Sequence, residues 1–332
     1  MKSKGNGGGV VETTDSKDET RKFDYQATKA KGTVFSNRED WLRQRRRGIG
    51  SSDAAAIMGL SRWGSPLSVF VDKLGLEERG DRDEEFMKWG HILEGPVAKE
   101  YADRTDRRLH NPGEFTIFQH DQLPFQQVTP DRMILQDPGG REDDPGSLSI
   151  KTGGFFKAKE WEDEPPLEYQ IQLQHELQVL GWSWGSFAIL IGGQKLIHLD
   201  VERDDAFIDK MVAAETDFWD RVLREDPPPA DDKESSAKAL ALLYPTSSGE
   251  SIALPANPFF DLADDLEVTQ ATIKLAEARK RGMENKVKRF MGEAEFGILP
   301  DGSSFTWKEQ SRKAYTKKIE ASSYRVLRRK KK

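Results

Sequence analysis

The sequence predicts an α/β (α+β) protein with a mixed β-sheet core flanked by helices, followed by a C-terminal helix and β-hairpin appendage. Long segments have apolar residues at every third or fourth position, and short apolar runs typical of strands lie between them. The predicted order is helix, three strands, helix, two strands and helix, which is typical of a mixed sheet covered by helices. The segment 226–236 (DPPPADDKESS) ends this core because consecutive prolines continue neither helix nor sheet.

Composition divides the chain into four regions. Residues 1–37 are glycine-rich and polar without periodicity, so we expect them to be mostly disordered. The core domain covers 38–226 and a linker covers 227–238. The region 239–332 is expected to hold a long helix, a strand pair and a basic tail.

Two short helices open the core. Residues 51–53 (Ser-Ser-Asp) supply candidate caps for a helix that ends at Gly59. Ser65 and Pro66 begin the next in the favoured N-cap and N1 order, and Gly75 follows its last turn.

Three longer helices are predicted at 84–103, 166–181 and 204–224. The first and last have apolar residues at three- and four-residue spacing, which defines their buried faces. These residues are Phe86, Trp89, Leu93, Val97 and Tyr101 in the first, and Phe207, Met211, Ala214, Phe218 and Val222 in the last. Strands are predicted at 114–119, 127–135, 147–152, 186–193 and 195–202.

The C-terminal region is predicted to contain a helix near 261–292 and a strand pair within 303–316. Apolar residues in the helix alternate by four and three, which is a heptad seam with two polar interruptions. The seam consists of Leu262, Leu266, Thr269, Ile273, Ala276, Lys280, Met283, Val287 and Phe290. We expect it to pack within the chain or against another subunit.

Charge and composition exclude several classes of protein. The chain has 33% charged residues and a net charge of −6, yet 43–47 (RQRRR) and 325–332 (RVLRRKKK) are basic. Such patches can attract a polyanion to one surface, or they can be solvated helix ends and tail. No apolar run approaches about 18 residues, and no secretory h-region is present, so neither a membrane span nor a secretory signal is expected. The absence of cysteine is compatible with a cytoplasmic location.

Four polar positions could form a reactive site: Glu94, Asp131, Lys151 and Gln172. Asp131 and Lys151 lie in neighbouring predicted strands, and alternation places Ser149 on the same face as Lys151. Glu94 lies beside the apolar face of its helix, where an unpaired carboxylate is costly. Gln172, with Tyr169 one turn earlier, could close the pocket. Carboxylate oxygens on a rigid sheet suit Mg²⁺, and a lysine could steady a water or phosphate beside the cation.

These positions and their contexts resemble a known family. The stretches RRRGIGSSDAAAIMGLS, GHILEGPVAKEYA, TPDRMI, LSIKT and EYQIQLQHELQVLGW, within 39–225, resemble the YqaJ-like phage recombinases. That family is related to phage lambda exonuclease within the PD-(D/E)XK nucleases. The C-terminal helix and FTWKEQSR…YRVLR resemble its tail. The resemblance implies 5′→3′ degradation of linear double-stranded DNA with Mg²⁺, or Mn²⁺, leaving a 3′ strand for a single-strand annealing protein.

The resemblance also assigns roles to residues. Glu94 and Asp131 match the metal-site carboxylates, Lys151 the motif lysine, and Gln172 the glutamine motif of the following helix, with Gln174 as a weaker match. The basic residues Arg45, Arg46 and Arg47, with Ser51, Ser52 and Asp53, match the segment near the 5′-phosphate. Arginine beside helix N–H groups makes physical sense as an anion site, although an ordinary helix start beside a surface arginine run would look the same.

Ser149 departs from the family pattern, which has Glu there. A neutral hydroxyl is a poor Mg²⁺ ligand, although the carbonyl of Ile150 could still ligate. Three alternatives remain open: activity is lost, the remaining ligands give impaired activity, or the carboxylate has migrated to Glu176, four residues after Gln172. The hairpin acids at 142–144 are expected to face water.

Three hypotheses therefore stand for function. The first is an Mg²⁺-dependent exonuclease acting at double-stranded DNA ends. The second is a catalytically silent DNA-end-binding or scaffold protein, and the third is a structural or regulatory phage protein without a DNA role. Relatives suggest a homo-oligomeric ring around DNA in the host-cell cytoplasm.

Overall fold

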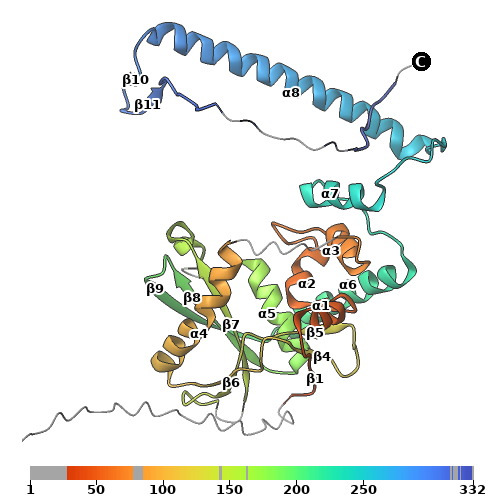
Figure 1. Ribbon diagram of the computed structural model, residues 1–332, viewed down its shortest axis with the longest axis vertical. Helices are drawn as coiled ribbons and strands as arrows, with labels where there is room; N and C mark the ends of the chain where they lie inside the picture. Colours follow the sequence, from red (N-terminus) through yellow and green to blue (C-terminus); the bar gives the residue numbers. More distant parts are fainter. Residues whose placement is uncertain are drawn as a thin grey trace, which may run out of the picture. The chain divides into compact units, whose positions relative to one another are not determined.

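The computed structural model describes residues 28–77, 85–141, 144–161, 164–314, 316, 321 and 323–330 (Figure 1). It forms two compact units, one ending at Leu243 and the other beginning at Tyr244. The first contains β1 (Lys31–Val34), α1 (Arg38–Arg46), β2 (Ile49–Gly50), α2 (Ser51–Ile57), α3 (Pro66–Lys73), α4 (Glu85–Thr105), β3 (Arg108–His110), β4 (Thr116–Gln119), β5 (Gln126–Val128), β6 (Arg132–Gln136), β7 (Gly146–Gly153), η2 (Phe155–Trp161), α5 (Leu167–Leu180), β8 (Trp184–Ile191), β9 (Lys195–Glu202), α6 (Asp205–Arg224) and α7 (Glu234–Leu243). The second contains α8 (Ala256–Met291), β10 (Phe296–Ile298) and β11 (Ser304–Thr306).

The first unit confirms the predicted α/β class with a mixed sheet flanked by helices. Its larger sheet has the order β3-β6-β7-β8-β9, in which β7 and β8 are parallel and the other pairs antiparallel. A second sheet, β1-β4-β5-β2, was not predicted as separate. The predicted strand 127–135 is in fact β5 and β6, one in each sheet, with Pro130 between them. Proline has no N–H to donate, so a ladder is readily interrupted there.

Helices cover both faces of the larger sheet. α4 packs Val97, Ala98 and Tyr101 against Leu148 and Ile150 of β7. On the other face, a separate core joins α5 to the sheet through residues that include Leu173, Leu177, Met133, Phe187 and Ile189. Figure 1 shows α4 and α5 on either side of β7. Consecutive residues of β7 therefore face different helices.

The helix starts refine the prediction in detail. The cap of α2 is Gly50, whose N–H donates to Asp53 Oδ2 at 3.0 Å, so 51–53 are helical and not the cap. Ser65 caps α3 as predicted. The predicted buried face of α4 is correct at Val97 and Tyr101 but wrong at Trp89, which is 53% exposed. The core against the sheet involves only the later turns of this helix, from Leu93 onward.

The end of the N-terminal segment is ordered, contrary to the prediction for 1–37. Residues 31–34 form β1, antiparallel to β4, and Ala30 is buried against the sheet core. Residues 38–46 form α1, and Asn37 accepts a cap hydrogen bond from the N–H of Asp40. This helix was missed because Trp41 and Leu42 are its only apolar residues. The prediction for 1–27 lies outside the described residues.

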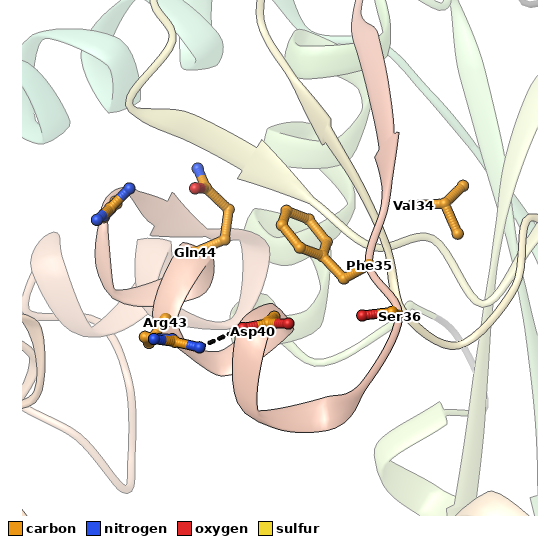
Figure 2. A pocket seen from close by; sticks show the side chains of 7 residues that line it. Val34, Phe35, Ser36, Asp40, Arg43 and Gln44 are labelled. Atoms are coloured by element: carbon orange, nitrogen blue, oxygen red, sulfur yellow. Dashed lines mark hydrogen bonds and ion pairs between the residues drawn. The ribbon is translucent and has the colours of Figure 1, made fainter.

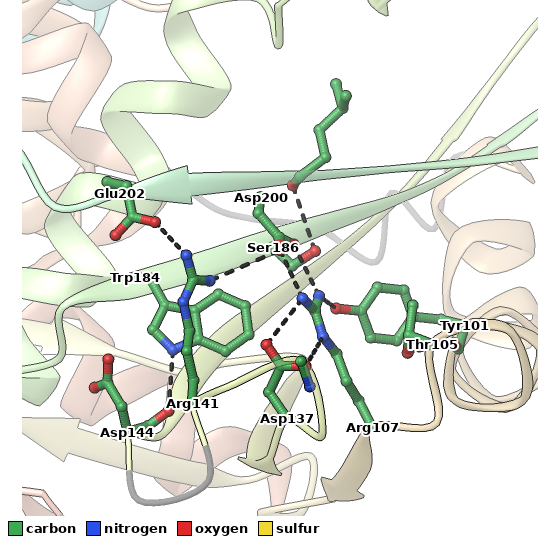
Figure 3. A network of polar contacts seen from close by, with 12 residues as sticks. Tyr101, Thr105, Arg107, Asp137, Arg141, Asp144, Trp184, Ser186, Asp200 and Glu202 are labelled. Carbon is green, nitrogen blue, oxygen red and sulfur yellow. Dashed lines mark hydrogen bonds and ion pairs between the residues drawn. The ribbon is translucent and has the colours of Figure 1, made fainter.

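A polar network fastens the β6–β7 hairpin to the sheet (Figure 3). Arg107 donates to Asp200 at 2.6 and 2.8 Å and to Asp137 at 3.2 Å. The Trp184 ring lies 4.7 Å from the guanidinium carbon of Arg107 and 4.3 Å from that of Arg141. This arrangement combines charge-assisted hydrogen bonds with cation–π contacts.

Of the acidic hairpin residues expected to face water, Asp144 is only partly exposed and is tied to the protein by hydrogen bonds. Its side chain accepts a hydrogen bond from Ser183. Its carbonyl accepts one from Trp184 Nε1 at 3.0 Å (Figure 3). Residues 142 and 143 lie outside the described part of the chain.

A buried ion pair fixes α5 against its other neighbours. His175 Nδ1 lies 2.8 Å from Glu215 Oε1 on α6, and His175 Nε2 lies 3.0 Å from the carbonyl of Gln127 on β5. Glu215 also accepts from Gln126 Nε2 at 2.6 Å. Burial alone would lower the pKa of His175, but the charge and hydrogen bond of Glu215 raise it overall. This places α5 firmly between the two sheets.

The second unit confirms the long helix and corrects its neighbours. α8 begins at Ala256, and none of its residues is buried. The strand pair joins 296–298 to 304–306, earlier than the predicted 303–316, because the polar turn at Asp301 and Gly302 lies between the strands. The predicted linker 227–238 overlaps α7, whose Ala239 packs on Leu67 and Val71 of α3, so the first unit extends beyond it. No helix of the described residues is long and apolar enough to cross a membrane.

Candidate active site

Asp131 is held at the break between β5 and β6. Its Oδ2 accepts the backbone N–H of Ile150 at 2.7 Å. The antiparallel register pairs Arg132 with Leu148, so the residue before Arg132 comes alongside the next part of β7. The interrupted strand thus delivers the carboxylate to the β7 segment that carries Ser149 and Lys151. Ile150 reaches the site through its N–H; a role for its carbonyl stays a prediction.

Glu176 brings a second carboxylate to this place from α5. It is only 2% exposed, accepts from Ser147 Oγ at 2.7 Å and accepts from Gln172 Nε2 at 3.2 Å. Burial raises the pKa of Glu176, the charge of Asp131 raises it further, and Ser147, Lys151 and Gln172 oppose that rise. A buried acid of this kind is costly unless a cation or a hydrogen-bonding network compensates it.

Glu94 approaches Asp131 from α4. Its side chain is 29% exposed, and its Oε1 lies 3.1 Å from His91 Nδ1. Burial raises the pKa of Glu94, and the charge of Asp131 raises it further, although His91 and Arg132 act in the opposite direction. Asp131 is therefore coupled to carboxylates on two helices that pack on opposite faces of the sheet.

Lys151 faces the same place from β7. Its Nζ lies 5.5 Å from the centre of the Tyr169 ring on α5, a cation–π distance. Its positive charge lowers the pKa of Glu176, against the effects of burial and of Asp131. The predicted residues Asp131, Lys151, Glu94 and Gln172 are thus brought together, and Glu176 joins them.

Ser149 is buried between these groups, 1% exposed, and its Oγ has no hydrogen-bond partner among the described residues. An unsatisfied hydroxyl next to mutually repelling carboxylates fits a site that a hard cation would complete. No three His, Cys, Asp or Glu side chains in the described ranges converge to form a cation cage. Mg²⁺ commonly needs only one or two carboxylates, with waters and substrate phosphate completing its shell, so these residues fit it.

The residues predicted to lie near the 5′-phosphate have different surroundings in the structure. Arg45 Nη2 lies 3.3 Å from Ser52 Oγ, and its guanidinium carbon lies 5.0 Å from the centre of the Trp41 ring. Asp53 is instead buried, accepting from Lys73 Nζ at 2.6 Å. Burial alone would raise the pKa of Asp53, but the charges of Lys73 and Arg45 and the hydrogen bonds lower it to about 2. Asp53 therefore holds the segment in place.

The remaining arginines of the segment diverge. Arg46 donates to the carbonyl of Glu77 at 3.4 Å. Arg47 lines a pocket of about 490 Å³ between α1 and the end of β1, together with Arg43, Gln44, Asp40 and others (Figure 2). Ser51 is the first residue of α2. The arginines of the basic run thus make separate contacts, and among them Arg45 is the one that contacts Ser52.

Two residues depart from the expected site. Gln174 points elsewhere: its Nε2 donates to the carbonyl of Glu202 at 2.7 Å and its Oε1 accepts from the N–H of Asp204 at 2.9 Å. Ser147 was missed, although it shares the alternating face of Ser149 and Lys151 on β7. That alternation was the signal that could have found it.

Together, the fold and site define a mixed α/β protein in which a sheet carries an aspartate and a lysine between glutamates from two helices. The chain belongs to the YqaJ-like viral recombinase domain family, as its resemblance predicted; the family model matches residues 40–183. The uncharacterized protein YqaJ of Bacillus subtilis (strain 168) is 34% identical over 275 residues, covering 81% of this chain and 83% of that protein.

Two solved structures are also similar. The alkaline exonuclease LHK-Exo from Laribacter hongkongensis is 18% identical with a TM-score of 0.46, covering 62% of this chain and 100% of that one. A phage-related exonuclease from Haemophilus somnus 129PT is 14% identical with a TM-score of 0.39, covering 54% of this chain and 96% of that one.

Proposed function

We propose that this protein is a divalent-metal-dependent 5′→3′ exonuclease that degrades linear double-stranded DNA and leaves a 3′ strand. One observation carries the proposal: the buried Glu176 carboxylate accepts a hydrogen bond from Ser147, on the same face of β7 as Lys151 and as Ser149, where the family pattern has its glutamate. Membership in a viral recombinase domain family supports a role in DNA recombination. Of the alternatives for Ser149, we favour the migrated carboxylate.

In this proposal Asp131 and Glu176 would hold Mg²⁺, or Mn²⁺, with waters and substrate phosphate completing its shell and Glu94 as a neighbouring carboxylate. When bound, the cation would supply charge neutralisation at the scissile phosphate and make a bound water more acidic. Ser147 and Gln172 hold the Glu176 carboxylate by hydrogen bonds, and Ile150 N–H orients Asp131. Lys151 donates from Nζ to the attacking water or to a phosphate oxygen, where charge develops in the transition state.

The DNA end is proposed to bind at Arg45 and Ser52. A guanidinium and a hydroxyl 3.3 Å apart suit the oxygens of a terminal 5′-phosphate. α2, which carries Ser52, packs on α5 through Ala54, Ala55 and Ile171. The DNA-end contact is therefore held against the same helix that carries Glu176. The proposed partners are a single-strand annealing protein and further copies of this chain in a ring, acting in the host cytoplasm.

A second candidate is a DNA-end-binding or scaffold protein without catalysis. Ser149 favours it, because this site has one carboxylate fewer on β7 than the family pattern. In that case Arg45 and Ser52 would still hold a 5′-phosphate while the carboxylates bound no productive cation.

Digestion of end-labelled linear duplex with Mg²⁺ or with EDTA tests the proposal. We expect digestion from the 5′ end that requires Mg²⁺, and loss of Mg²⁺ binding by calorimetry in Asp131→Asn. Asp121→Asn, an exposed carboxylate in a turn, is the matched control and should behave as the parent. A parent that binds ends but never cuts them would support the scaffold alternative.

A further inference from the structure

Trp63 is an exposed indole next to the candidate active site. It lies in the connection between α2 and α3 and is 58% exposed. Its ring centre is 6.1 Å from that of Tyr169, whose own ring lies 5.5 Å from Lys151 Nζ. One aromatic ring therefore links this indole to the lysine of the site.

The connection that carries Trp63 is held in place by hydrogen bonds. Ser61 Oγ accepts from the N–H groups of Trp63 and Gly64, both at 3.1 Å. Lys233 Nζ donates to the carbonyls of Gly59 and Gly64, both at 3.1 Å. An exposed indole on so constrained a segment loses little conformational freedom when it binds a ligand.

The rings behind Trp63 are anchored in the core. Tyr169 stacks on Trp161 with ring centres 5.1 Å apart and planes at 25°. Trp161 is 3% exposed and packs edge-on against Phe187 of β8 at 5.6 Å. The row Trp63–Tyr169–Trp161 thus runs from the surface, past Lys151, into the sheet core.

Arg62 lies over one face of the indole. Its guanidinium carbon lies 5.1 Å from the centre of the Trp63 ring. Arg62 donates to Glu168 on α5 at 2.6 Å and to Glu160 at 3.2 Å, which holds the guanidinium in position. Arg62 is thus neutralised by these two glutamates, and Lys151 is the cation near the aromatic surface that can attract a phosphate-linked ligand.

We propose that Trp63 stacks on a nucleobase of the DNA strand whose backbone passes Lys151. Bases follow one another at about 3.4 Å along a duplex strand. The distances from Trp63 to Tyr169 (6.1 Å) and from Tyr169 to Lys151 Nζ (5.5 Å) together therefore correspond to a few nucleotides. Stacking on an aromatic ring accepts every base, which suits an enzyme that must advance through any sequence. The inference rests on the proposed function, since it takes the DNA strand at Lys151 as given.

The test uses the full-length protein in EDTA with duplexes that carry 2-aminopurine at successive positions near the 5′ end. Stacking quenches this base, so the parent should quench one or two positions selectively. Trp63→Ala should lose that quenching and bind DNA about 5- to 150-fold more weakly, the range expected for one lost base–aromatic stack. Trp63→Phe should retain most of the quenching and most of the DNA affinity. Trp307→Ala, which removes a 47% exposed indole from the second unit, is the matched control.

Digestion with Mg²⁺ is measured separately, so that the two proposals can fail independently. Unchanged quenching and affinity in Trp63→Ala would overturn the stacking role even if the parent digests DNA. Selective quenching that depends on Trp63 would support the role even if the parent cuts nothing, in which case only the hydrolytic proposal fails.

Discussion

Ser147 Oγ and Glu176 Oε2 lie 2.7 Å apart, and this hydrogen bond joins β7 to α5 at the centre of the candidate site. Ser147, Ser149 and Lys151 share one face of β7, so Glu176 is held against the face where the family pattern has its glutamate. Hydrogen bonds to a ligand carboxylate orient it and tune its affinity for a cation.

Ser147→Ala should therefore weaken the metal site without removing any proposed ligand. We expect about 10- to 100-fold lower Mg²⁺ affinity or activity, the usual cost of losing such a supporting hydrogen bond. The measurement is a Mg²⁺ titration of the digestion rate. Ser186→Ala removes another buried strand hydroxyl, which donates to Leu199, and should leave the titration unchanged. Equal titrations for the two variants would contradict the role of Ser147.

The arginines of the basic segment should differ in their effect on DNA ends. Arg45 meets Ser52, whereas Arg46 donates to a backbone carbonyl. Arg45→Ala should reduce the preference for 5′-phosphorylated over unphosphorylated ends and lower the salt slope of binding by about 1. Arg46→Ala should leave the end preference intact. Binding titrations at several salt concentrations measure the end preference and the salt slope. Equal losses of end preference in the two variants would show that the segment is a general basic surface.

Hydrophobic periodicity predicted the buried helices and strands of the core but not the peripheral elements. The helices α5 and α6 and the strands β7 to β9 have strong apolar patterns, and each formed close to its predicted range. β1 was missed because its stability comes from pairing with the distant segment β4, which local sequence does not reveal. Trp89 was wrongly placed inside because a helix pattern does not say where the underlying sheet ends.

The candidate site was predicted in the same uneven way. Glu176 was suggested by its helical spacing from Gln172, and the structure adds that it is buried and bound to Ser147. Asp53 was grouped with the phosphate segment because of its neighbours in sequence. Its partner, Lys73, lies in another helix, so only tertiary structure reveals that this acid is structural.

Asp53 should make stability depend on acid pH. Its pKa is lowered from 3.8 to about 2 in the folded protein, so its contribution is complete above about pH 4 and is lost as pH falls towards 2. The shift corresponds to about 2 kcal/mol. Asp53→Asn should flatten this part of the pH profile and lower the free energy of unfolding by about 3 kcal/mol, since the buried Lys73 loses its closest carboxylate and keeps only Asp72, at 4.0 Å. Urea unfolding from pH 2 to 7 measures both; an unchanged profile would contradict the pair's role.

Ser149→Glu should gain little activity in the parent. Ser149 is 1% exposed, and a second buried carboxylate near Glu176 would add volume and repulsion, at a cost of about 1–3 kcal/mol in stability. In a Glu176→Gln background the same substitution should restore part of the lost digestion, because the site regains one carboxylate. Digestion rates of the two single variants and the double variant measure this. A Ser149→Glu single variant far more active than the parent would instead mean that the parent lacks a ligand.

Mg²⁺-dependent digestion of linear duplex by Glu176→Gln tests the central claim most directly. The parent should digest and the variant should be slower by about 100-fold or more, which is about 2.7 kcal/mol of lost transition-state stabilisation. Its DNA-end affinity should be unchanged, and Glu114→Gln, an exposed acid in a turn, should digest like the parent. Digestion by Glu176→Gln at the parental rate would contradict the assignment of Glu176 as the carboxylate that replaces the family glutamate.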